Sequence, residues 1–437
     1  MKRIGGIHPE YNKLTSEEKI VAAPHPNKVI LPLQQHIGAP CEALVAAGDI
    51  VKAGQKIAEA KGFVSAPIHS SISGKVTAMG PARHPVLGDY NAITIETVPG
   101  MELKEEYKKR DNALSLGKDE LKAIIKDAGI VGMGGAAFPT HVKLSPPAEK
   151  KIDTVILNGA ECEPYLTCDH RIMIEEADKI LKGLQVIMKI LEPKDTFIGI
   201  EENKEDAIIV MQIKLKELGL NHKIKVIKLP TFYPQGSEKN LILSITGREV
   251  PNAGGLPMDV GVVVQNVQTA KAIYDAVFEG KPLIERVITI TGAVKQPKNI
   301  LVKIGTNTKE LIDFCGGYEG AIGKVISGGP MMGIAQSNDE MPVIKGSSGI
   351  LAQIEGVSEP AERDCIRCAR CVDACPVRLM PTIIYQYTRK EDYDMANEYF
   401  AMDCFECGCC SFICPSKIPL TQWMKVAKSE LAKRKKK

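Results

Sequence analysis

The chain has 437 residues, and its share of hydrophobic residues (44%) and charged residues (25%) is that of a globular protein with about three or four domains. The formal net charge is only +3, and no basic patch interleaves with aromatic residues, so nucleic-acid binding is not indicated. The amino terminus lacks the apolar core of a signal peptide, and no run of about eighteen apolar residues occurs, so we expect no membrane span. Thirteen cysteines without an export signal indicate reduced thiols in the cytosol.

Residues 1–100 are predicted to form a small β domain, because they are rich in Pro, Gly, Val and Ile and show little helical period. Two segments in this region, GDIVKAGQKI at 48–57 and APIHSSISGKV at 66–76, resemble hairpins of the lipoyl and biotinyl carrier family. The likeness implies a β sandwich-hybrid fold. The modified lysine of that family lies in a DKA or MKM tip, whereas Lys61 lies in AKGF, so we do not expect Lys61 to carry a group.

A charged segment at 101–118 is predicted to be a solvated linker or a short exposed helix, and after it the pattern changes to alternating strands and helices. Strands are expected at 154–157, 196–200, 223–229 and 260–264. Apolar residues recur at helical spacing over 173–191, where Pro193 ends the pattern, and again over 207–215 and 269–278. Such repetition predicts a mostly parallel sheet covered by helices, which we place at residues 119–284.

Three further regions complete the chain. Residues 285–350 carry strand patterns at 287–292 and 299–304, a short helix near Leu311 and a glycine-rich turn at 328–330, which together indicate a small α+β module. Residues 359–420 contain paired cysteine motifs and are predicted to form a helical, ferredoxin-like domain. Residues 421–437 are expected to be a basic carboxy-terminal tail, within which a terminal helix carries a weak apolar stripe that packs on its own domain: Trp423, Val426, Ala427 and Leu431.

Eight cysteines fall into two copies of C-x2-C-x2-C-x3-C-P, a spacing in which three thiolates bind one iron–sulfur cube and the fourth reaches the neighbouring cube. The pattern predicts two [4Fe-4S] clusters, one on Cys365, Cys368, Cys371 and Cys414 and the other on Cys404, Cys407, Cys410 and Cys375. Structural zinc and disulfides are the alternatives, although zinc sites usually pair two CxxC elements across a longer spacer. The remaining cysteines are expected to be buried, unreactive thiols: Cys41, Cys162, Cys168, Cys315 and Cys409.

A glycine-rich segment, GIVGMGGAAFPTHVK at 129–143, opens the α/β region. Closely spaced glycines let backbone amides approach a phosphate, and Lys143 is placed to neutralise it, although a plain turn explains such a run equally well when it is taken alone. Three more polar loops follow predicted strands: NGAECEP at 158–164, YPQGSEKN at 233–240 and QNVQT at 265–269. Because open α/β sheets bind nucleotides in loops at strand ends, we expect these segments to line one crevice.

These four segments resemble, in order, the patterns GxGGAGFPTxxK, NADESEP, YxxGEE and NNVET of the NADH-oxidising flavoprotein subunit of respiratory complex I. With the β domain and the two-cluster region, nearly the whole chain resembles the RnfC family, which supplies one of the subunits of Rnf electron-transport complexes. Two positions depart from the pattern, since Ala160 replaces an Asp and Ser237 replaces an acidic residue.

The resemblance implies cofactor contacts at numbered positions. Groups that hold the phosphate and ribityl part of FMN would be Gly132, Gly134, Gly135 and Lys143. Groups around the rest of the flavin would be Asn158, Glu161, Tyr233, Gly236, Gln265 and Asn266. Groups beside the nicotinamide dinucleotide would be Glu163, Glu238 and Phe138. The resemblance also implies a ligand-binding β-grasp module at 285–350 and no catalytic side chain, since FMN carries the hydride transfer.

The resemblance further implies an NAD-dependent oxidoreductase subunit. NADH gives up two electrons as a hydride and a [4Fe-4S] cluster normally accepts one, a difference that a flavin reconciles. We therefore expect electron exchange between NAD(H) and membrane partners through FMN and two clusters, within a ferredoxin:NAD+ oxidoreductase that pumps Na+ or H+. The expected location is peripheral, on the cytoplasmic side of the membrane, with ferredoxin an indirect partner. The alternatives are a non-enzymatic iron–sulfur carrier or scaffold, and the NADH-oxidising subunit of a soluble hydrogenase or dehydrogenase complex.

Overall fold

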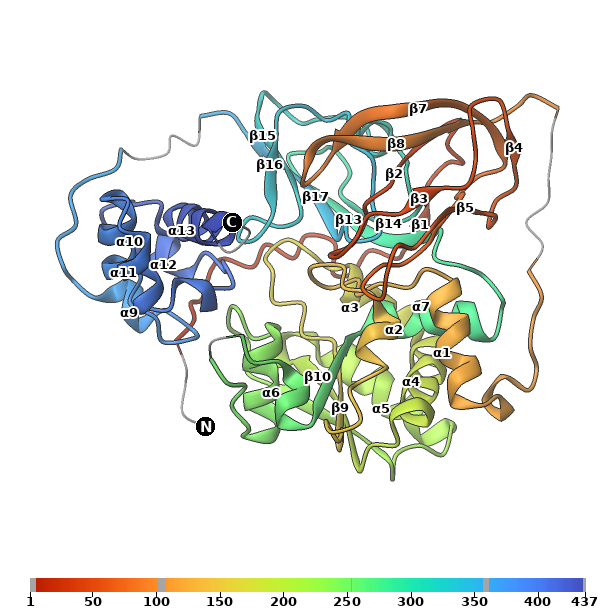
Figure 1. Ribbon diagram of the computed structural model, residues 1–437, viewed down its shortest axis with the longest axis horizontal. Helices are drawn as coiled ribbons and strands as arrows, with labels where there is room; N and C mark the ends of the chain where they lie inside the picture. Colours follow the sequence, from red (N-terminus) through yellow and green to blue (C-terminus); the bar gives the residue numbers. More distant parts are fainter. Residues whose placement is uncertain (1–4, 101–106, 253, 357–360, 435–437) are drawn as a thin grey trace.

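The computed structural model describes residues 5–100, 107–252, 254–356 and 361–434. Two small β sheets pack beside a parallel sheet with helices and a larger mixed sheet, while a helical carboxy-terminal domain lies to one side (Figure 1). Within the described ranges, no helix combines the length and the apolar character needed to cross a bilayer. Part of the predicted linker, residues 101–106, lies outside the described residues.

The predicted amino-terminal β domain is confirmed as two antiparallel sheets. One has the strand order β2 (Lys28–Pro32), β8 (Gly88–Glu96), β7 (Gly74–His84) and β4 (Ile50–Val51), and the other has the order β3 (Glu42–Ala43), β5 (Lys56–Glu59) and β6 (Ile68–His69). Alternate residues such as Val29, Leu31, Ile93 and Ile95 are fully buried, as expected for strands with one face on a core. This core is continuous with that of helix α1 (Lys118–Asp127), so the β domain packs on the α/β domain.

The α/β domain is built on the predicted parallel sheet, with the strand order β11 (Ile224–Leu229), β10 (Asp195–Glu201), β9 (Thr154–Asn158) and β12 (Val262–Asn266). Val155 and Leu157 pack in one core with α4 (Ala177–Leu191) and α7 (Val267–Val277). Ile156, between them, packs with α6 (Glu238–Thr246) on the opposite face. Because both of its faces are covered, the central strand β9 carries an uninterrupted apolar run at 155–157. Helix α5 (Glu205–Glu217) follows β10.

Two element predictions in this domain need correction. The period over 173–191 predicted one helix, but the structure has α3 (Cys168–Glu175) and then α4, because Glu176 leaves the helical region with φ −126° and ψ 24°. The strand predicted at 260–264 is β12, two residues later, because Val260 ends a 3-10 turn and Gly261 adopts a φ of 73°. Gln265 and Asn266 therefore end a strand instead of following one.

The larger mixed sheet has the order β1 (Val21–Ala22), β14 (Lys298–Lys303), β13 (Glu285–Gly292), β17 (Gly349–Ile354), β15 (Ile322–Ser327) and β16 (Ile334–Gln336). The predicted strands β13 and β14 and the predicted helix α8 (Thr308–Phe314) are confirmed, and they share one apolar core. Strand β1 comes from the amino terminus and pairs in parallel with β14. We call residues 5–23 the strap, because this segment runs from the helical domain across the α/β domain to this sheet (Figure 1).

The carboxy-terminal domain contains α9 (Arg370–Asp373), α10 (Pro381–Arg389), α11 (Tyr393–Glu398), α12 (Cys409–Ile413) and α13 (Leu420–Arg434). The predicted terminal helix is α13, and its apolar stripe packs on its own domain as expected: Ala427 and Leu431, together with Met424, lie in one core with α10 and α11, so the described part of 421–437 belongs to this domain. Its basic end is engaged as well: Lys433 pairs with Glu430 and Arg434 with Asp394. Residues 435–437 of the basic run lie outside the described residues.

Candidate functional site

The four polar loops meet at the carboxyl end of the parallel sheet, as predicted. The Asn158 side-chain amide donates to the Gly236 carbonyl at 2.9 Å, which joins the second loop to the third. Lys143 Nζ donates to the Glu238 carboxylate at 2.8 Å and to the Val264 carbonyl at 3.2 Å, which joins the first loop to the third and to the end of β12. These bonds join residues 78 to 121 positions apart in sequence, and we call the place where the four loops meet the crevice.

The glycine-rich loop has two functions that its sequence does not distinguish. Gly129 has a φ of 67°, and a Cβ there would lie 2.3 Å from the Pro67 carbonyl oxygen, so this glycine permits close packing on the β domain. A Cβ on Gly135 would meet no atom of the described chain within 4 Å, which leaves the backbone there open to a ligand. Phe138 closes the loop, because its carbonyl accepts from Gly132 N at 2.8 Å.

Two buried polar groups beside this crevice fit an FMN that would sit there. Gln265 is 2% exposed, and its Nε2 has no hydrogen-bond partner among the described residues. The hydroxyl oxygen of Ser237, on the third loop, is likewise buried and has no hydrogen-bond partner among the described residues. Since buried donors are normally satisfied, these groups, the open backbone at Gly135 and the Lys143 ammonium form a suitable donor set for an anionic, polar cofactor.

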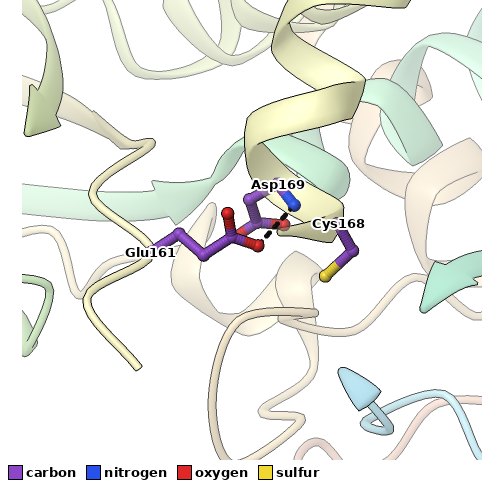
Figure 2. Close-up of side chains that lie close together, drawn as sticks. All are labelled: Glu161, Cys168 and Asp169. Carbon is purple, nitrogen blue, oxygen red and sulfur yellow. Dashed lines mark hydrogen bonds between the residues drawn. The ribbon is translucent and has the colours of Figure 1, made fainter. Parts of the chain in front are cut away.

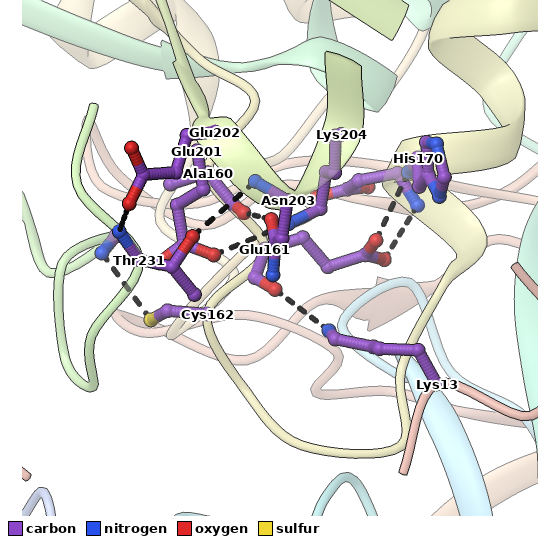
Figure 3. A network of polar contacts seen from close by, with 12 residues as sticks. Lys13, Ala160, Glu161, Cys162, His170, Glu201, Glu202, Asn203, Lys204 and Thr231 are labelled. Atoms are coloured by element: carbon purple, nitrogen blue, oxygen red, sulfur yellow. Dashed lines mark hydrogen bonds and ion pairs between the residues drawn. The ribbon is translucent and has the colours of Figure 1, made fainter. Parts of the chain in front are cut away.

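Glu161 is tied to the start of α3. Its carboxylate accepts from the backbone N–H of Asp169 at 2.7 Å (Figure 2) and from that of His170 at 3.0 Å (Figure 3). A carboxylate at this place satisfies two of the free N–H groups of the helix and is favoured by the helix dipole. Glu161 therefore fixes the second loop onto α3.

Two lysines that the sequence analysis missed hold the same loop (Figure 3). Lys13, on the strap, donates to the carbonyls of Glu161, Glu163 and Leu166 at 2.8, 2.9 and 2.6 Å. Lys204 donates to the Ala160 carbonyl at 2.6 Å and also to Glu201 and Asn203. Burial, with the charge of Lys204, lowers the pKa of Lys13.

Each ammonium has three N–H donors, and each of these lysines is bonded to three acceptor oxygens. Both lysines therefore position the loop, and neither has a donor left for the cavity of about 520 Å³ that they help to line. No local sequence signal points to Lys13, because it acts on residues about 150 positions away.

Glu163 and Tyr233 face the neighbouring domains. Glu163 Oε1 accepts from Met331 N at 2.7 Å and Met332 N at 3.1 Å, in the turn between β15 and β16, and burial raises the pKa of this carboxyl. Tyr233 is 1% exposed, and its hydroxyl donates to the Cys407 carbonyl at 2.8 Å. The crevice is therefore connected to both the mixed sheet and the cysteine-rich domain.

The two sets of cysteines predicted to bind the two clusters differ in exposure. One small cavity is lined by the four cysteines that the spacing predicts for one cluster, Cys375, Cys404, Cys407 and Cys410, and also by Cys409. Of the other set, Cys368 is exposed, whereas burial raises the pKa of Cys371, with smaller contributions from Cys414 and Cys365. Four thiols around one cavity are a soft donor set that suits an iron–sulfur cluster. The five remaining cysteines are buried, and burial raises the pKa of Cys41, Cys162, Cys168 and Cys315, as expected for unreactive thiols.

Four family models match the chain in order: an RnfC barrel sandwich hybrid domain at 1–98, a Nuo51 FMN-binding domain at 125–275, an SLBB domain at 287–335 and a 4Fe-4S dicluster domain at 360–415. The chain is 52% identical to the C subunit of the proton-translocating ferredoxin:NAD(+) oxidoreductase complex of Clostridium ljungdahlii, over 98% of this chain and 93% of the relative. It is 45% identical to the C subunit of the Na(+)-translocating ferredoxin:NAD(+) oxidoreductase complex of Acetobacterium woodii, over 98% and 96%.

Two further comparisons extend these findings. The C subunit of the ion-translocating oxidoreductase complex of Rhodobacter capsulatus is 44% identical, over 98% of this chain and 83% of the relative. A solved NAD+-reducing [NiFe]-hydrogenase in the H2-reduced state superposes with a TM-score of 0.53 at 14% identity, over 75% of this chain and 63% of that chain. At this identity the superposition shows a shared fold alone.

Proposed function

Because the chain belongs to the RnfC family, the C subunits of ion-translocating ferredoxin:NAD+ oxidoreductase complexes, we propose that it exchanges electrons between NAD(H) and the other subunits of such a complex. It is an oxidoreductase subunit whose cofactors are FMN and [4Fe-4S] clusters, in an assembly that translocates Na+ or H+ and takes ferredoxin as an indirect partner. The observation that carries the proposal is the contact, through Tyr233 and Cys407, between the four loops and the cavity lined by the predicted ligands of one cluster.

We assign the anionic end of FMN to the backbone of Gly132, Gly134 and Gly135 and to Lys143, whose ion pair with Glu238 shows that its charge already lies at the crevice. Side chains around the rest of the flavin are those of Asn158, Glu161, Tyr233, Gln265 and Asn266, with Gly236 giving space. We assign the dinucleotide side to Phe138, Glu163 and Glu238. When bound, FMN accepts a hydride and releases electrons singly. The protein groups bind and orient it.

The different exposure of the two cysteine motifs supports an order for electron transfer. The cavity of Cys375, Cys404, Cys407 and Cys410 adjoins the flavin loops, because Cys407 and Cys409 pack with Tyr233 and Cys162 in one apolar cluster. The other predicted set of ligands, Cys365, Cys368, Cys371 and Cys414, includes the exposed Cys368. We therefore propose that the inner cluster exchanges electrons with the flavin and that the outer cluster exchanges them with a partner.

Finer aspects of the architecture are part of the proposal. We propose that the first domain at 1–100 has a lipoyl-like hybrid fold, that the FMN and NADH domain spans 119–284 and that residues 285–350 form a β-grasp module. The ferredoxin-like unit is placed at 359–420 and extended by α13, which packs on it. We further propose a peripheral location on the cytoplasmic side of the membrane, bound through protein partners.

Purification from cells in mild detergent tests the proposal against its alternatives. We expect a chain that retains FMN and two [4Fe-4S] clusters, oxidises NADH with an artificial acceptor and copurifies with membrane subunits. Brown protein without flavin and without NADH oxidation would instead indicate an iron–sulfur carrier or scaffold. Copurification with soluble hydrogenase or dehydrogenase subunits would indicate the other alternative.

A further inference from the structure

Asp169, the second residue of α3, lies at the crevice but belongs to none of the four loops. It is 8% exposed, and its two carboxylate oxygens have different partners. Oδ2 accepts from the Asn266 side-chain amide at 2.6 Å, and Oδ1 accepts from the Gln268 side-chain amide at 2.9 Å. One carboxylate thus holds two amides of the turn from β12 to α7.

These bonds are part of a continuous series that crosses the crevice. Glu161 accepts from the backbone N–H of Asp169, Asp169 accepts from Gln268, and Gln268 Oε1 accepts from Val287 N of β13 at 3.2 Å. The glycine-rich loop reaches the same place, because a Cβ on Gly134 would lie 2.5 Å from Asn266 Nδ2. The orientation of Asn266 is therefore determined by Asp169 on one side and by the glycine-rich loop on the other.

Glu161, Cys168 and Asp169 offer atoms within 4.8 Å of one another, a spacing that also suits a metal ion (Figure 2). Their hydrogen bonds argue for a structural role. Both Glu161 oxygens accept backbone N–H groups, both Asp169 oxygens accept amides, and Cys168 Sγ donates to the Ser348 carbonyl at 3.3 Å. The group is fully engaged in fixing chain segments.

We propose that Asp169 is a positioning residue for the flavin, which holds the side chains of Asn266 and Gln268 in the orientation that FMN requires. The inference rests on the proposed FMN site. It adds a residue that does not itself contact the cofactor. Asp169 acts by accepting two hydrogen bonds, a function that only the ionised carboxylate performs, since Asn or a protonated acid presents a donor to one of the two amides.

The substitution Asp169→Asn tests this role in the full, cluster-loaded chain after removal of the flavin. FMN is titrated back and binding is followed by quenching of its fluorescence. We expect the dissociation constant to rise about ten- to a hundredfold, the usual effect of losing one hydrogen bond to a charged group. The matched control is Asp206→Asn, since Asp206 also contacts α3, through His170 Nε2 at 2.7 Å, and this control should change the constant less than about twofold.

The pH dependence of the FMN dissociation constant distinguishes a positioning role of the Asp169 carboxylate from a purely structural role. Burial, and next the charge of Glu161, raise the pKa of Asp169 to about 6, while Arg286 on β13 opposes the shift and Cys168 lies beside it. The acceptor form is the ionised one, so the wild-type chain should retain FMN affinity above this pH and lose it as the pH falls through about 6. Asp169→Asn should lack this step. Titration of the FMN phosphate itself affects both proteins equally and cannot produce the difference between them.

The outcomes separate this inference from the proposed function. Wild-type chain that binds no FMN overturns both. FMN binding by Asp169→Asn with wild-type affinity, equal losses in Asp169→Asn and Asp206→Asn, or identical pH profiles would overturn the role of Asp169 alone. If Asp169→Asn does not fold, the step near pH 6 is measured on the wild-type chain with riboflavin, which has no phosphate to titrate. A flat riboflavin profile then contradicts the inference.

Discussion

The hydroxyl of Tyr233 donates a hydrogen bond of 2.8 Å to the backbone carbonyl of Cys407. Tyr233 belongs to a loop of the parallel sheet and Cys407 to the second cysteine motif, and both are buried. Ile7 of the strap, Cys162, Ala374 and Cys409 surround them in one apolar cluster. The part of the chain assigned to the flavin and the part assigned to the clusters therefore meet in a contact from which water is excluded.

Replacing Tyr233 by Phe tests how much this contact contributes to folding stability and to electron transfer. The ring is retained, but the Cys407 carbonyl loses its donor in a buried place, which typically costs about 1–3 kcal/mol. We expect the free energy of unfolding to fall by that amount in denaturant titrations, and NADH-dependent cluster reduction to slow in stopped-flow measurements. Tyr274→Phe is the control, since that hydroxyl bonds to Glu279 at a half-buried site and its loss should cost under about 0.5 kcal/mol. Equal stability of the two variants would argue against a tight junction at Tyr233.

Two alanine substitutions separate the functions of the glycine-rich loop. Gly129→Ala forces a Cβ to 2.3 Å from the Pro67 carbonyl at a φ of 67°, so we expect a loss of more than about 1 kcal/mol in folding stability. Gly135→Ala places its Cβ in open space, so its stability should be unchanged, while FMN affinity should fall because the methyl group occupies the place of the cofactor. The measurements are thermal unfolding and FMN titration. Full FMN affinity in Gly135→Ala would remove this loop from the flavin site.

Glu163→Gln removes the charge of Glu163 but retains an oxygen that can accept its backbone hydrogen bonds. The amide oxygen of Gln can still accept from Met331 N and Met332 N, so the turn of the mixed sheet should keep its place. Losing one charged hydrogen bond costs about 1.5–3 kcal/mol, so the dissociation constant for NADH should rise roughly ten- to a hundredfold while bound FMN stays at the wild-type level. Lys143→Ala should show the reverse, with FMN lost. If Glu163→Gln loses FMN and Lys143→Ala retains it, the assignment of these loops is inverted.

Much of the architecture could be predicted because its signals are local. Apolar runs such as 154–157 are strands buried on both faces, and the eight motif cysteines are recognisable by spacing alone. The break between α3 and α4 was missed because the apolar period continues through Glu176 although the backbone does not. The terminal helix was predictable from its apolar stripe, although that stripe did not include Met424, which is buried beside Ala427 and Leu431.

The site was predictable in its loops and not in what holds them. Lys13, Lys204 and Asp169 act on residues distant in sequence, through backbone carbonyls or side-chain amides that leave no motif. Glu163 was expected beside the dinucleotide from resemblance, whereas its bonds to Met331 and Met332 depend on a turn some 170 residues away, which only the fold brings near.

Lys13→Met tests whether the strap holds the second loop. Methionine retains the unbranched apolar part of the side chain but removes the donor to three carbonyls, so we expect a loss of at least about 2 kcal/mol in unfolding free energy together with weaker FMN binding. Lys19→Met, on an exposed part of the same strap, is the control and should stay within about 0.5 kcal/mol of wild type. If Lys13→Met and Lys19→Met show the same unfolding free energy and the same FMN affinity, the strap does not hold the second loop through Lys13.

Oxidation of the reduced chain by NAD+ tests whether the flavin and both clusters form one path for electrons. Protein loaded with FMN and iron is reduced chemically under argon, freed of reductant and mixed with NAD+, while EPR follows the clusters and absorbance follows NADH. If one flavin and two clusters form a single path, both cluster signals should disappear and about two NADH should form per chain, since the flavin stores about two electrons and each cluster about one. Cluster signals that persist in the presence of excess NAD+, or zinc in place of iron, would contradict the account.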